Sequence, residues 1–415
     1  MLGASPTINN SGIISATGAG AFAILGVSND ITLNILPGSH IIGRINLGDN
    51  GGDNDTANVF TGGISSYLTF ENTENINLFG AGVVIGNDVI TVDPSGTSAL
   101  STGLSHFTDA VHNMVNQQLA HVTPFKPVQV ASLELAPGML FQPQGPVAWS
   151  QVLGGRLDRK AQGSSVGYDN DQVGIAFGYE WDVNQYRIGL LGGAAFADTD
   201  ANNHSFETNT DSYFLGAYGQ YNFDAFKVTI SAIGGYNEYD HQRAVIDNIN
   251  GAEVAKSDFD AVFLSPSITV STAYTVNEYW EFRPSATLNY SVAWLEGYTE
   301  RGTTNSNLKV DDRTLQTWAA RVQLALAYKL NEHNELALRA GLDARHNNND
   351  RSNASIAGNA FSFSEVGEQN ISGGFIGARL QVAAFDSLTV SADVEYAKGS
   401  DEKSVRGFIR IAAPF

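Results

Sequence analysis

Apolar and polar side chains alternate with a period of two from residue 147 to the end of the chain. In residues 280–295, WEFRPSATLNYSVAWL, one face is apolar with aromatic side chains at both ends, and the other face is polar. Strict alternation predicts β-strands. A soluble sandwich rarely places aromatic residues at both ends of its buried face, whereas a transmembrane β-barrel carries aromatic girdles around a lipid-facing band. We therefore predict strands that cross a membrane.

Counting these stretches predicts twelve strands, and an even count suits a closed barrel. The strands are expected near 147–155, 171–183, 185–197, 210–223, 225–239, 257–275, 279–297, 313–330, 334–346, 369–384, 386–398 and 403–415. Short turns alternate with long loops, which are expected near 156–170, 198–209, 240–256, 298–312 and 347–368. Because short turns face the periplasm in such barrels, both ends of the barrel segment should lie on the periplasmic side.

The final strand has one apolar face and one basic face. Gly407, Ile409, Ile411 and the terminal Phe415 share the apolar face of GFIRIAAPF, opposite Arg406 and Arg410. In a barrel this strand must pair with the first one, since pairing removes the open sheet edge.

One convincing helix precedes the strands, at residues 98–119. Its apolar positions recur every three or four residues, at Leu100, Leu104, Phe107, Val111, Met114 and Val115. Ser98 or Ser101 is the expected N-cap. The helix would be roughly 33 Å long at 1.5 Å per residue, about the thickness of the hydrocarbon core of a bilayer. Because Asp109, Asn113 and Asn116 are among many polar residues along it, the helix suits a wet channel with a charged, hydroxyl-rich lumen better than lipid. A surface helix of a soluble domain is the alternative.

Four regions are predicted: 1–96, 97–121, 122–146 and 147–415. The first contains short β-branched runs separated by Gly, Asn and Asp, which predicts a short parallel β-helix. Its eight acidic residues outnumber its one basic residue, Arg44, and the acidic stretch around Asp49, Asp53 and Asp55 does not match the spacing of a calcium loop. The third region holds five of the eleven prolines, which predicts an extended linker.

Composition narrows the function. A net charge of −20 argues against nucleic acid as a partner. There is no cysteine and no run of eighteen apolar residues. The start, MLGASPTINN, lacks the basic and apolar regions of a signal peptide, so we expect the chain to be the C-terminal part of a longer exported precursor.

No catalytic motif or Cys/His cluster is present, and no metal, cofactor or enzyme activity is predicted. Charged residues on the polar faces of the strands could be mistaken for a catalytic group. We interpret them as lumen charges that hydrate the pore and pair with one another or with the helix. They are Glu180, Arg187, Arg283, Arg321, Arg339, Asp343, Arg345, Asp393, Glu395, Arg406 and Arg410.

The helix, the linker and a barrel that opens with PVAWSQVLGG and closes with GFIRIAAPF resemble the translocator domain of a type V autotransporter over residues 98–415. This resemblance implies an outer-membrane barrel of a Gram-negative bacterium, with the helix threaded through the pore and residues 1–96 as the end of a β-helical passenger at the cell surface. It also implies a monomer in contact with outer-membrane lipid and lipopolysaccharide.

By the same resemblance, the barrel-assembly machinery and periplasmic chaperones would insert the barrel, reading a signal at Gly407, Ile409, Ile411 and Phe415. Ala413 stands where many relatives carry a second aromatic residue. Some relatives cut themselves at an Asn-Asn pair in the pore helix, but Asn113 and Asn116 are separated, so we expect no cleavage here. Two alternatives are a porin-like channel for small solutes and a surface adhesin or enzyme whose activity lies in the missing passenger.

Overall fold

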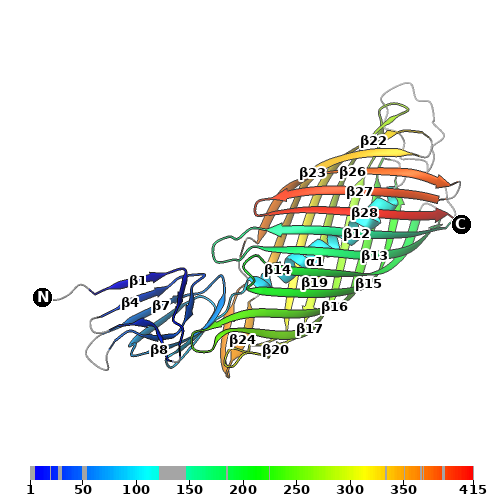
Figure 1. Ribbon diagram of the computed structural model, residues 1–415. Helices are drawn as coiled ribbons and strands as arrows, with labels where there is room; N and C mark the ends of the chain where they lie inside the picture. Colours follow the sequence, from blue (N-terminus) through cyan, green and yellow to red (C-terminus); the bar gives the residue numbers. More distant parts are fainter. Residues whose placement is uncertain are drawn as a thin grey trace.

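A closed antiparallel barrel of twelve strands forms most of the computed structural model (Figure 1). The structure describes residues 5–18, 20–26, 30–48, 54–120, 146–183, 186–223, 225–331, 334–349, 351–364, 367, 369–385 and 388–414. The barrel strands are β12 (Val147–Arg159), β13 (Tyr168–Val183), β14 (Tyr186–Ala201), β15 (Phe206–Asn222), β16 (Lys227–Asp247), β17 (Gly251–Ser271), β19 (Trp280–Leu295), β22 (Arg313–Lys329), β23 (Glu335–Asn349), β26 (Asn370–Phe385), β27 (Leu388–Gly399) and β28 (Glu402–Pro414). Pairing of β12 with β28, from Val147 opposite Pro414 to Arg159 opposite Glu402, closes the sheet. The predicted barrel is confirmed.

The outward face of the barrel is apolar. On β22, Val322 is 58% exposed and Leu324 is 50% exposed, while Arg321, directly before Val322, points inward. On β28, Ile409 and Ile411 are exposed in the same way. Apolar side chains exposed around a whole sheet are stable against lipid rather than water.

The predicted long loops 198–209 and 240–256 are mostly strand, and the loop predicted at 156–170 is shortened to residues 160–167. The strands continue through most of these residues, and β16 and β17 stay paired as far as Asp247 opposite Gly251. Alternation also continues there, but Glu238 and Asp240 replace apolar residues on the outward face. The lipid-facing pattern therefore ends where the strand leaves the membrane, whereas the strand itself does not.

The other two long connections contain short strands. They are β20 (Tyr298–Thr299), β21 (Lys309–Val310), β24 (Ser352–Ile356) and β25 (Asn359–Phe363). These strands pair in that order in a small antiparallel sheet at the loop end of the barrel, which we call the loop sheet. At the opposite rim, β18 (Tyr274–Thr275) pairs with the start of β19.

Helix α1 (Ser95–Leu119) runs through the interior of the barrel (Figure 1). It starts three residues earlier than predicted, and the Asp93 carboxylate accepts a hydrogen bond from the Ser95 backbone N–H. Ser98 and Ser101 are therefore not caps, and their hydroxyls donate to carbonyls within or just before the helix. Of its 25 residues, 20 are buried, and no helix among the described residues is long and apolar enough to cross a bilayer.

The N-terminal strands pair mostly in parallel. One stack is β1 (Thr7–Asn10), β4 (Thr32–Ile35), β7 (Thr56–Phe60) and β9 (Asn75–Phe79); a second is β2 (Ile13–Ser15) and β5 (His40–Ile42); a third is β3 (Phe22–Leu25), β6 (Arg44–Asn46) and β8 (Ser65–Glu71). Their inward side chains form a separate aliphatic core. The antiparallel hairpin β10 (Gly82–Ile85) and β11 (Asp88–Thr91) leads to α1. We call residues 5–93 the stub, and its interpretation as a β-helix stays a prediction.

Several predictions fall on residues that the structure does not describe. Residues 121–145 of the predicted linker, Asp49, Asp53 and the terminal Phe415 lie outside the described residues.

Candidate functional site

The lumen wall has an apolar part, which the sequence analysis missed. Inward side chains, mainly of β12–β17, pack against the apolar face of α1. They include Trp149, Leu153, Leu191, Phe214, Tyr218, Ile233 and Phe263. The prediction of a charged, hydroxyl-rich lumen did not include this apolar part. Several of these strands carry apolar residues on both faces, and alternation then does not show which face is inward.

Helix residues Leu104, Phe107 and Val111 lie on this apolar side. The Phe107 ring meets the Phe214 and Phe263 rings edge to face, at centroid distances of 5.5 and 5.6 Å. Edge-to-face aromatic pairs are specific in geometry as well as apolar. The helix is therefore held in one rotational orientation about its axis.

The opposite part of the wall, on β19 and β22–β28, is charged and internally paired. Glu335 accepts from Arg283 at 2.6 Å and from Arg379 at 3.2 Å. Glu395 accepts from arginines on three different strands: Arg321 at 2.6 Å, Arg339 at 3.1 Å and Arg406 at 3.0 Å. Two further pairs are Arg339 with Asp393 and Arg345 with Glu402.

All the proposed lumen charges lie on the inward side of the barrel. Glu180 and Arg187 are on the other part of the wall, where Arg187 bonds Asp182 at 3.0 Å. Arginine side chains in the lumen pairs are at most 14% exposed. Because buried charges need partners, carboxylates shared among several arginines offset part of the cost of burying charge in this wall.

A chain of hydroxyls and one imidazole joins α1 to the wall between these two parts. His112 bonds the Ser231 hydroxyl at 2.9 Å through Nδ1 and the Ser265 hydroxyl at 3.0 Å through Nε2. Ser265 also bonds Ser291 at 2.9 Å, and Ser291 bonds Thr108 at 2.8 Å. In the sequence, this chain could have been predicted from the small hydroxyl residues at inward positions of neighbouring strands.

Both ends of α1 are also fixed. Near its start, the Ser95 hydroxyl accepts from the Val166 N–H at 2.9 Å, on the loop between β12 and β13. Near its end, Gln118 donates to Glu180 at 2.9 Å and accepts from Arg410. The helix therefore spans the barrel from the loop end to the short-turn rim, where β12 begins.

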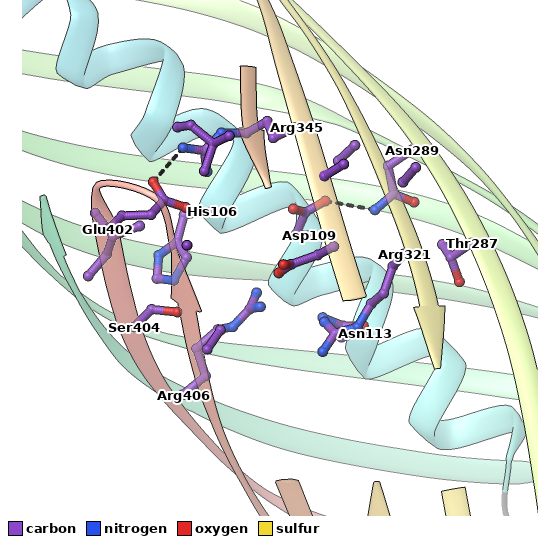
Figure 2. A pocket seen from close by; sticks show the side chains of 18 of the residues that line it. His106, Asp109, Asn113, Thr287, Asn289, Arg321, Arg345, Glu402, Ser404 and Arg406 are labelled. Carbon is purple, nitrogen blue, oxygen red and sulfur yellow. Dashed lines mark hydrogen bonds and ion pairs between the residues drawn. The ribbon is translucent and has the colours of Figure 1, made fainter. Parts of the chain in front are cut away.

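On its polar side, α1 faces open space in the lumen. Asp109 accepts from the Asn289 amide at 2.7 Å (Figure 2). Asn113 and Asn116 line a cavity toward the short-turn rim. Among the described residues, no group of three or more His, Cys, Asp or Glu side chains could hold a metal ion.

Comparison with known proteins identifies the barrel. Residues 148–395 match the family described as autotransporter beta-domain. The chain is 23% identical over 171 residues to esterase EstA of Pseudomonas aeruginosa, which covers 40% of this chain and 26% of that protein. It is 26% identical over 203 residues to outer membrane protein A of Rickettsia rickettsii, which covers 46% of this chain and 9% of that protein. The chain thus spans about a quarter or less of these relatives.

Among solved structures, the translocator domain of autotransporter NalP from Neisseria meningitidis is similar, with a TM-score of 0.59. The alignment covers 78% of this chain and 99% of that domain, at 14% sequence identity. At this identity the similarity shows a shared fold.

Proposed function

Because the chain belongs to the autotransporter β-domain family and its barrel is an outer-membrane translocator, we propose that it exports the segment preceding α1 and displays that segment on the cell surface. The position of α1 carries this proposal. The helix runs through the lumen, with Ser95 beside the loop end and Gln118 bonded to Glu180 of β13 and Arg410 of β28 near the opposite rim. A chain threaded this way connects an inner rim to an exported segment.

The stub lies on the tip of the β16–β17 hairpin. Val245, Ile246 and Asp247 add a parallel strand to stub strand β8. Asn248 then bonds stub backbone at Gly43 and Thr69: its Nδ2 donates to both carbonyls at 3.2 Å, and its Oδ1 accepts from the Thr69 N–H at 2.8 Å. Pairing of backbone groups covers an otherwise open sheet edge.

An apolar contact reinforces this attachment. Ile90 and Val92 of the stub form one buried cluster with Val310, Ile356 and Phe363 of the loop sheet. The contact supports display of the stub in a fixed orientation on the barrel rather than on a free tether.

The β-domain itself is not catalytic. We place any enzymatic or adhesive activity of the whole protein in its exported part, because the similarity to an esterase covers only a quarter of that relative. We also propose that α1 remains uncut, since Asn113 and Asn116 are not adjacent.

The outward apolar face indicates contact with outer-membrane lipid. Lipopolysaccharide, periplasmic chaperones and the barrel-assembly machinery are proposed partners, and the chain is proposed to act as a monomer. The closing strand supports a role in assembly for Gly407, Ile409 and Ile411, together with Phe415, because β28 pairs with β12 along its whole length.

Protease cleavage sites inserted into the connections between barrel strands, and tested on intact cells, report the topology of the barrel. A site at Asn305, in the loop region beside the loop sheet, should be cut from outside, and a site at Asn331, in a short turn, should be cut only after the outer membrane is opened. Cleavage in the opposite pattern would invert the barrel and remove the proposed direction of export.

A further inference from the structure

Helix α1 leaves space on its polar side. A cavity of about 60 Å³ lies between His106, Asp109 and the charged wall (Figure 2). A second cavity, of about 150 Å³, continues toward the short-turn rim. Both are lined by Asn113, Thr287 and Arg321, so they meet beside the middle of the helix.

These cavities extend toward both ends of the barrel. The first reaches Glu402 in β28 at the loop end. The second reaches Ala120, Thr272 and Ala273 at the opposite rim. Since a single water needs about 10–15 Å³ of such space, the two cavities have room for a continuous file of water.

The lining of this space is predominantly cationic. It contains seven inward cationic side chains: Lys227, Arg283, Arg321, Arg339, Arg345, Arg379 and Arg406. Four carboxylates also line it: Asp109, Asp343, Glu395 and Glu402. Glu281, Glu335 and Asp393 bond the arginines but are not part of the lining. An ion in this space therefore meets more cationic side chains than carboxylates.

On three of these arginines, one buried nitrogen of the guanidinium group donates no hydrogen bond to the described part of the protein. Arg321 Nε, Arg345 Nε and Arg406 Nη1 are buried and have no acceptor among the described residues. A buried charged donor without an acceptor is costly, so it requires water or an anion. All three side chains belong to the cavity lining.

We infer that the space beside α1 is a passage selective for small inorganic anions. Export explains why a helix occupies the pore, but not why the remaining space is lined by cationic groups with free donors. The passage binds anions such as chloride at the guanidinium groups and lets them cross while the helix stays in place. Potassium ions are repelled from the same lining.

Planar-bilayer recording of the purified full chain under a potassium chloride gradient tests this inference. A cleft lined by one sign of charge concentrates counter-ions by roughly ten-fold or more. Because carboxylates also line this space, a chloride preference of up to about ten-fold is expected. Lys227→Glu and Arg321→Gln should each reduce the preference by several-fold. Arg156→Gln removes a positive charge from the outward face, where the side chain is half exposed, and should leave the preference unchanged.

The inference would be overturned by an absence of conductance, by a preference for potassium, or by equal selectivity in the unmodified chain and its three variants. Heat-modifiable migration on gels verifies that each variant is folded. Surface display of the stub in cells is scored separately, so loss of anion selectivity with normal display contradicts the passage alone, and loss of display contradicts the proposed export function.

Discussion

Replacing Phe107 with Ala should free α1 from the lumen for part of the time. The ring is 6% exposed and lies between the rings of Phe214 and Phe263. Truncating a buried Phe costs about 3–5 kcal/mol. Since each 1.4 kcal/mol is a factor of ten, the equilibrium between docked and undocked helix should shift by roughly a hundred-fold to a few thousand-fold.

Single-channel recording should detect this shift as large-conductance openings that are rare in the unmodified chain. Phe196→Ala is the matched control, because Phe196 is 46% exposed and faces lipid on β14. If the Phe107 variant opens no more often than the Phe196 variant, the packing of α1 on the aromatic wall does not hold it in the pore. Removing residues 1–119 should give the open state permanently, and equal conductance with and without the helix would mean that α1 is not in the pore.

Three further predictions concern the stub and the barrel wall. Asn248→Ala removes the hydrogen bonds that this side chain makes to the stub backbone, and each buried group left without a partner costs about 1–3 kcal/mol of stability. The stub should then become sensitive to protease, whereas Asn305→Ala should leave it resistant. Ile409→Arg places a charge on the lipid face, which costs about 2–4 kcal/mol of barrel stability near the membrane centre. This variant and the deletion of Phe415 should each lower the yield of folded barrel in heat-modifiability assays. Partial burial and a hydrogen bond to a carboxylate raise the pKa of Tyr67 from 10.0 to about 12, so its contribution to stability should be lost as pH rises from 10.0 to about 12; Tyr67→Phe should remove this dependence in alkaline unfolding curves.

Barrel strands could be predicted because lipid imposes a simple rule on them. Trp318, Val322 and Leu324 alternate with inward polar residues, and the same alternation recurs until the closing strand. The helix was predictable for a similar reason, since its apolar residues have a helical period. Local periodicity is sufficient when one face of an element contacts a uniform apolar medium.

Contacts between distant elements could not be predicted in this way. Asn248 looks like an ordinary turn residue in the sequence, yet it is fully buried against the stub. Phe214 and Phe263 look lipid-facing when read along strands with two apolar faces, yet they touch Phe107. In each case the partner is far away in the sequence, and only the closure of the barrel brings the two together.

The distribution of lumen ion pairs has a mechanical consequence. Glu395 on β27 ties β22, β23 and β28 together, and Glu335 ties β23 to β19 and β26, so one side of the cylinder is cross-braced between strands that are not neighbours. On the other side, the aromatic wall rests on α1. The helix therefore acts as a strut as well as a plug. An emptied barrel should flatten preferentially on the β12–β17 side, where the ion pairs of Arg187 with Glu180 and Asp182 link only neighbouring strands.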